Sequence, residues 1–167
     1  MNRFARLSTL VSLGLSALCS VVLFGAVAAA APFPAATAGE WDGTGLVRAV
    51  DGTDQGTFTI HMIRSALTAT KTRQDGEVTL PDGRKITFWQ EMENHGGRGY
   101  SLVSNKGTGG GHCFSNAMCQ FYEAVTGTSQ AFATTVSLDG ADKMRIVVTE
   151  LDAGKAVRFI EQSLSKR

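Results

Sequence analysis

The stretch QAFATTVSLDGADKMRIVVTE, residues 130–150, decides the fold of this chain. Apolar and polar side chains alternate along 130–138 and again along 143–150, and Asp139-Gly140 marks a turn between the two segments. Alternation with a period of two residues places one set of side chains on each face of a β-strand. The stretch therefore predicts two antiparallel strands joined by a tight turn.

The same alternation recurs along 57–63 and 85–92. Turn dipeptides such as Asp51-Gly52 divide the rest of the chain into short segments rich in Thr, Val, Ile, Phe and Tyr, which is typical of a β-meander. Residues 63–72 fit either a short helix or the end of a long strand. We expect an all-β domain of roughly eight to ten antiparallel strands. Because so large a sheet must protect its edges, it should close into an up-and-down barrel, with a two-sheet sandwich as the alternative.

The N-terminus has the three parts of a secretory signal peptide. Arg3 and Arg6 supply a positive charge, residues 10–27 are mostly apolar, and residues 28–31 are all alanine. The competing interpretation is an uncleaved membrane anchor, because an apolar run of this length can just span a bilayer. We expect export to the periplasm or the cell exterior.

Cleavage by signal peptidase after Ala28, Ala30 or Ala38 would fit the small residues of this region. The small, apolar residues that follow the signal give no reason for order. The predicted organisation is a signal peptide at 1–30, a flexible leader at 31–38 and a single β-barrel domain at 39–167.

The exported chain is close to neutral. The full sequence has 16 Lys and Arg against 15 Asp and Glu, and removing Arg3 and Arg6 with the signal leaves 14 against 15. No block of like charge occurs. Nucleic acid and anionic membranes bind basic patches, so we expect no nucleic-acid partner and no membrane contact except through an uncleaved signal.

Two cysteines remain after removal of the signal peptide, which contains Cys19. Cys113 and Cys119 are an even pair in an oxidising compartment, where a disulfide is the expected state. The five residues between them have turn character at Ser115-Asn116. A bridge across this hairpin should stabilise the fold by about 2–3 kcal/mol, because the loop that it closes is short.

The run Gly39-Glu40-Trp41-Asp42-Gly43-Thr44-Gly45 opens the domain. It resembles the first strand of calycin-type barrels, both lipocalin-like and nitrobindin-like. The resemblance implies that Trp41 closes one barrel end and that Gly39, Gly43 and Gly45 let the strand coil sharply. It also implies a basic residue late in the barrel packed over the tryptophan ring, and Arg158 is the candidate for this cation–π contact.

Nitrobindin-like proteins bind haem through a histidine in a late strand, but no histidine follows His112 in this sequence. We therefore expect no haem and no other cofactor. A zinc site around His112 and Cys113 would lack its remaining ligands. The glycine-rich run 106–111 is followed by no helix pattern that would make it a phosphate loop, so we expect a flexible loop between strands.

The function favoured by these features is a binding protein that holds a small apolar or amphipathic molecule inside the barrel. Candidate ligand-facing residues are His61, Trp89, Tyr100 and His112. The alternative is an envelope protein–protein interaction module, or an inhibitor, that meets its partner through surface loops. No catalytic residue can be assigned, so an enzyme ranks third.

Overall fold

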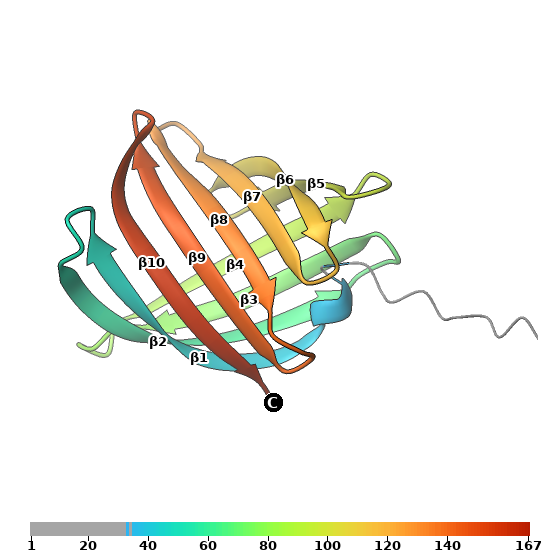
Figure 1. The fold of residues 1–167 in the computed structure, drawn as a ribbon, viewed down its shortest axis with the longest axis horizontal. Coiled ribbons are helices and arrows are strands. Elements are labelled where there is room, and N and C mark those ends of the chain that lie inside the picture. The colour runs from blue at the N-terminus through green and yellow to red at the C-terminus, as the bar shows by residue number, and fades with distance from the viewer. Residues whose placement is uncertain (1–32, 34) are drawn as a thin grey trace, which may run out of the picture.

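The computed structural model describes Phe33 and residues 35–167, and the expected signal peptide lies outside these residues. The described residues form an all-β, closed antiparallel barrel of ten strands (Figure 1). Each strand pairs with its sequence neighbours, and β1 pairs with β10 to close the sheet. This confirms the calycin-like barrel and rules out the two-sheet sandwich. The elements are η1 (Ala35–Thr37), β1 (Gly39–Ala49), β2 (Asp54–Ala66), β3 (Lys71–Thr79), β4 (Lys85–Asn94), β5 (Gly99–Ser104), β6 (Gly107–Ser115), β7 (Met118–Val125), β8 (Gln130–Leu138), β9 (Lys143–Asp152) and β10 (Lys155–Lys166).

Strands β8 and β9 form the hairpin that the alternating sequence predicts. Thr134 lies opposite Val148 and Val136 opposite Ile146, and all four side chains face the barrel interior. The intervening residues face outward, as the pleat of a strand requires. Strands β2 and β3 are separated by a short turn after Ala66, so the strand alternative holds for this region. Within the described part of the chain, no helix has the length and apolar character needed to cross a bilayer.

The glycine-rich run is a strand, β6, and not the flexible loop that its composition predicts. The reason is close packing between backbones: a Cβ atom added at Gly109 would lie 1.8 Å from the carbonyl oxygen of Tyr122 in β7. The same relation holds in the first strand, where a Cβ at Gly43 would lie 2.0 Å from the Ser163 carbonyl oxygen. Glycine at these positions lets neighbouring strands coil tightly around the barrel.

One end of the barrel is closed by residues that precede the first strand. The Phe33 side chain is only 1% exposed, and Thr37 in η1, four residues later in the chain, is fully buried. The Tyr100 hydroxyl donates a hydrogen bond to the Phe33 carbonyl. The expectation of a flexible leader at 31–38 is therefore corrected for its described part, since burial of Phe33 gives this segment the apolar packing that its composition did not suggest.

Trp41 also lies at this closed end. Its side chain is fully buried, and its indole N–H donates to the Thr37 carbonyl oxygen at 2.9 Å. The basic group over its ring is Lys166, whose Nζ lies 5.7 Å from the ring centroid. The expected contact from Arg158 is wrong, because the Arg158 side chain is bound to a carboxylate inside the barrel.

The Cys113–Cys119 disulfide is confirmed. The two cysteines are register partners on β6 and β7, and both side chains are buried in the core. A disulfide at this position fits an oxidising compartment.

Candidate ligand-binding cavity

The barrel encloses a cavity of about 610 Å³. This volume lies in the range of roughly 300–1,000 Å³ that is usual for small-molecule sites. The cavity reaches the surface at the β5–β6 turn, where Asn105 and Lys106 line it and are exposed. Its apolar wall includes Phe58, Phe88, Phe121, Phe132, Ile146 and Val148.

Arg64 lines the cavity close to the closed end of the barrel. It occupies β2 on the same face as the buried Met62, and its side chain is only 4% exposed. Its Nε donates to Gln74 Oε1 at 3.1 Å, Nη2 donates to the same oxygen, and Nη1 donates to Thr37 Oγ1. Its Cζ lies 5.9 Å from the centroid of the Phe33 ring.

The guanidinium of Arg64 is thus surrounded by neutral groups. Desolvation lowers the pKa of Arg64 to about 10. No carboxylate within the described residues forms an ion pair with it. A buried charge without a counter-charge is costly to the folded state.

A second buried charge, Glu123, lies on β7. Gln90 donates from Nε2 to its Oε2 at 3.2 Å, and the Ser104 hydroxyl donates to its Oε1. Register places Arg64, Gln74, Gln90 and Ser104 side by side on four successive strands, β2 to β5. The cavity therefore has a polar band that runs from a buried cation to a buried carboxylate.

The third polar feature is an ion pair between Glu150 on β9 and Arg158 on β10. These residues are register partners, and Arg158 Nη2 donates to Glu150 Oε1 at 3.0 Å. The hydrogen bond that Arg158 donates to the Glu150 carboxylate raises the pKa of Arg158. Because each member of this pair neutralises the other, Arg158 is not available as a free cation. Lys106 is exposed at the mouth of the cavity, with its Nζ 4.7 Å from the centroid of the Phe132 ring.

The structure separates the four residues expected to face a ligand. Tyr100 is inside the barrel but belongs to the closed end, where it holds Phe33. His61, Trp89 and His112 do not line the cavity. Trp89 and His112 lie on the outer wall. Arg73 Cζ lies 4.8 Å from the centroid of the Trp89 ring, and the His112 ring packs edge-on against Phe114 with centroids 5.5 Å apart. A ligand inside the cavity would therefore not meet these three residues.

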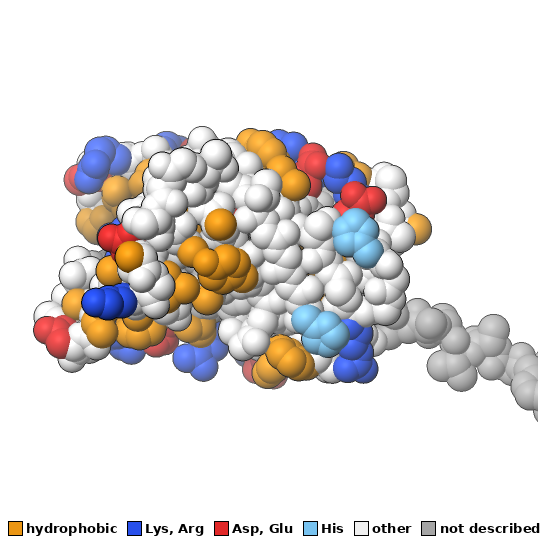
Figure 2. Space-filling view, turned by 90° about the horizontal axis from the view of Figure 1, so that it is seen from above, with side chains coloured by type: hydrophobic (Ala, Val, Ile, Leu, Met, Phe, Trp, Pro, Cys, Tyr) orange, Lys and Arg blue, Asp and Glu red, His pale blue; other side chains and the backbone are white. Residues whose placement is uncertain are grey.

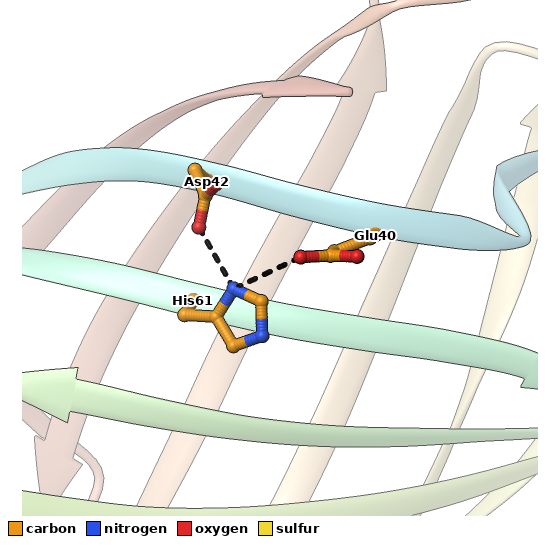
Figure 3. A group of neighbouring side chains, drawn as sticks. All are labelled: Glu40, Asp42 and His61. Carbon is orange, nitrogen blue, oxygen red and sulfur yellow. Dashed lines mark hydrogen bonds and ion pairs between the residues drawn. The ribbon is translucent and has the colours of Figure 1, made fainter. Parts of the chain in front are cut away.

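His61 belongs to a small cluster on the outer wall (Figure 3). Its Nδ1 lies 2.8 Å from Asp42 Oδ1 and 4.0 Å from Glu40 Oε1, and ligand atoms of all three residues lie within 4.8 Å of one another. Such a set could share a metal ion. Arg167 already pairs with both carboxylates, donating from Nη1 to Glu40 at 2.6 Å. The cluster is therefore a surface ion-pair network whose carboxylates already have a basic partner, and not an open site.

The outer wall formed by β5 to β8 has a different character. These four strands contain no Lys, Arg or Asp, and their one acidic residue, Glu123, faces inward. Tyr122 is 52% exposed on this wall. Figure 2 looks onto the molecule from above, and uncharged groups fill the centre of that view while charged side chains lie toward its edges.

Arg64, Glu123 and Glu150 are the charged cavity residues that sequence reasoning missed. Arg64 continues the inward face of Ile60 and Met62, and Glu150 continues that of Ile146 and Val148. The alternation itself could have found them: it places the residue two positions after the last apolar one on the same inward face.

Comparisons with known proteins identify the fold alone. The S-type phycobiliprotein lyase CPES from Guillardia theta superposes with a TM-score of 0.64 at 9% identity, over 79% of this chain and 89% of that chain. Rv2717c from M. tuberculosis gives 0.61 at 11% identity, over 79% of this chain and 93% of that chain. No protein-family model matches the sequence. No curated protein matches it either.

Proposed function

We propose that this protein is an exported binding protein that holds a small apolar or amphipathic molecule inside its barrel. The observation that carries the proposal is the cavity of about 610 Å³, which opens at the β5–β6 turn and has a wall rich in phenylalanine. A barrel core that served stability alone would be filled by its own side chains, because protein interiors are close-packed.

Two further findings support this proposal. The fold is similar to that of a phycobiliprotein lyase, and this similarity supports a role for the barrel with a small molecule. The Cys113–Cys119 disulfide agrees with export, which the N-terminal sequence also predicts.

A neutral solvatochromic dye, Nile red, tests the proposal in solution. Its emission should rise and shift to the blue on titration with the protein, because the dye enters an apolar cavity. Val148 lines the cavity, and Val147 beside it on β9 does not. Val148→Trp should fill the cavity and weaken dye binding at least tenfold, whereas Val147→Trp should bind as the wild type does. Equal binding by both variants would show that the dye binds elsewhere and would contradict the proposal.

The interaction-module alternative has one observation in its favour, the uncharged outer wall of β5 to β8. Tyr122, near the centre of β7, is the largest exposed side chain there. If a protein partner uses this wall, Tyr122→Lys should abolish its capture in a pull-down and leave Nile red binding unchanged.

A further inference from the structure

The Arg64 guanidinium has hydrogen-bonding capacity that its protein partners do not use. An arginine side chain offers five N–H donors in a planar fork. Three of its donor bonds go to two neutral acceptors, Gln74 Oε1 and Thr37 Oγ1. These acceptors satisfy hydrogen bonds, but they bring no negative charge to a side chain that is 4% exposed.

The acidic residues of the cavity do not supply that charge. Glu150 is bound to Arg158 through two hydrogen bonds. Glu123 is bound to Gln90 and to Ser104. Ser104 lies three strands away from Arg64 across the sheet, about 14 Å along the wall at the usual strand spacing.

The surroundings of Arg64 constrain what could supply the charge. The Arg64 side chain lines the cavity and lies beside the Phe33 ring. An anionic group that pairs with it must therefore reach it through the cavity and be attached to an apolar body. A monoanion would neutralise Arg64. A dianionic phosphate would leave excess negative charge in a cavity that also holds Glu123, whose hydrogen-bond partners are neutral.

We propose that Arg64 binds the carboxylate of an amphipathic ligand that enters the barrel with its anionic group first. The planar carboxylate accepts the two remaining N–H groups of the fork. The apolar body of the ligand lies along the phenylalanine-rich wall, and its far end points to the mouth at Lys106. This assignment rests on the proposed function and names the ligand class of the same site.

The test compares cis-parinaric acid, a fluorescent apolar carboxylate, with its methyl ester. The two probes share one apolar body and differ in charge. Wild-type protein should bind the acid roughly tenfold or more tightly than the ester, as expected for a charge-assisted hydrogen bond in a buried site. Arg64→Met should remove this preference by weakening acid binding while ester binding stays the same. Arg73→Met is the matched control, because Arg73 lies on the outer wall and pairs with surface carboxylates. It should keep the wild-type preference.

Equal affinity of the acid and the ester for the wild type would overturn the assignment without any variant. A preference for the acid that survives in Arg64→Met would overturn it as well. If circular dichroism shows that Arg64→Met does not fold, Arg64→Lys replaces it, and this variant should retain part of the preference because it keeps the charge.

The probes also separate this inference from the function on which it rests. If the ester, the acid and Nile red all bind with similar affinity, the cavity binds small molecules and the role of Arg64 is wrong. If none of the three binds, the proposed function itself fails, and the assignment of Arg64 fails with it.

Discussion

The Tyr100 hydroxyl donates a hydrogen bond to the carbonyl of Phe33, a residue 67 positions earlier in the chain. The rings of both residues also contact Phe121, with centroids 6.3 Å and 6.4 Å from it. Through these contacts a segment that precedes the first strand becomes part of the barrel core. The closed end of the cavity therefore depends on the N-terminal segment as well as on the strands.

Replacing Phe33 with alanine should destabilise the barrel by about 3–5 kcal/mol, the usual cost of truncating a buried phenylalanine. The side chain is 1% exposed and packs against Phe121. Urea denaturation followed by tryptophan fluorescence measures the change. Phe114→Ala is the control: because the Phe114 side chain is 50% exposed, the free energy of unfolding should change by less than about 1 kcal/mol. A similar small change for both variants would contradict the role given to Phe33.

For a chain that carries the proposed signal peptide, the burial of Phe33 also predicts where this peptide is cut. Cleavage after Ala28 or Ala30 would leave Phe33 on the mature chain, whereas cleavage after Ala38 would remove it together with the buried Thr37. We expect the intact mass of the exported protein to correspond to one of the first two positions. A mature chain that begins at Gly39 would contradict this account of the closed end.

Gly109→Ala should destabilise the protein by about 2 kcal/mol or more. Its Cβ would lie 1.8 Å from the Tyr122 carbonyl oxygen, and a backbone atom in a sheet can move away only by straining the ladder. Gly99→Ala, on the adjacent strand, would meet no atom within 4 Å and should be nearly neutral. Thermal unfolding of the two variants checks the difference. Equal melting temperatures would show that the approach of β6 to β7 is not as close as described.

Glu91 should make stability depend on acid pH. The hydrogen bond from Lys71 Nζ at 2.6 Å, and then that from Arg73, lower the pKa of Glu91 below its ordinary value of 4.5. A carboxyl with a lowered folded-state pKa stabilises the fold above its unfolded pKa, and this contribution is lost as the pH falls through the folded-state value. Glu91→Gln should therefore be less stable than the wild type near pH 7 and equal to it at about pH 2. An equal loss at both pH values would contradict this assignment.

Much of the fold could be predicted from the sequence because several strands carry one apolar and one polar face. In β9, Met144, Ile146 and Val148 alternate with outward residues, and this pattern alone specifies a half-buried strand. Strand β6 could not be predicted in this way, since its glycines have no side chains to show a period. What makes glycine necessary there is the carbonyl of a neighbouring strand, as at Gly109, and that proximity exists only in the folded barrel.

The candidate site was harder to predict than the fold. Arg64 and Glu150 lie at the ends of apolar inward faces, where the sequence alone does not tell whether a charged residue points inward or the strand has already ended. Arg158 was noted for a contact with Trp41, but the strand tilt that brings Lys166 there instead is set by the closure of β1 against β10. Which basic residue contacts Trp41 depends on the pairing register of β1 with β10, and local sequence patterns do not contain this register.

Native mass spectrometry of the gently purified protein tests the central claim most directly. We predict an added mass in the native spectrum that disappears when the same sample is denatured, with a value that corresponds to a small organic molecule able to occupy about 610 Å³. The protein mass itself should be about 2 Da below the reduced value, as the Cys113–Cys119 disulfide requires. A bare protein mass in repeated preparations, together with no binding of Nile red, would contradict the claim that the barrel is a small-molecule site.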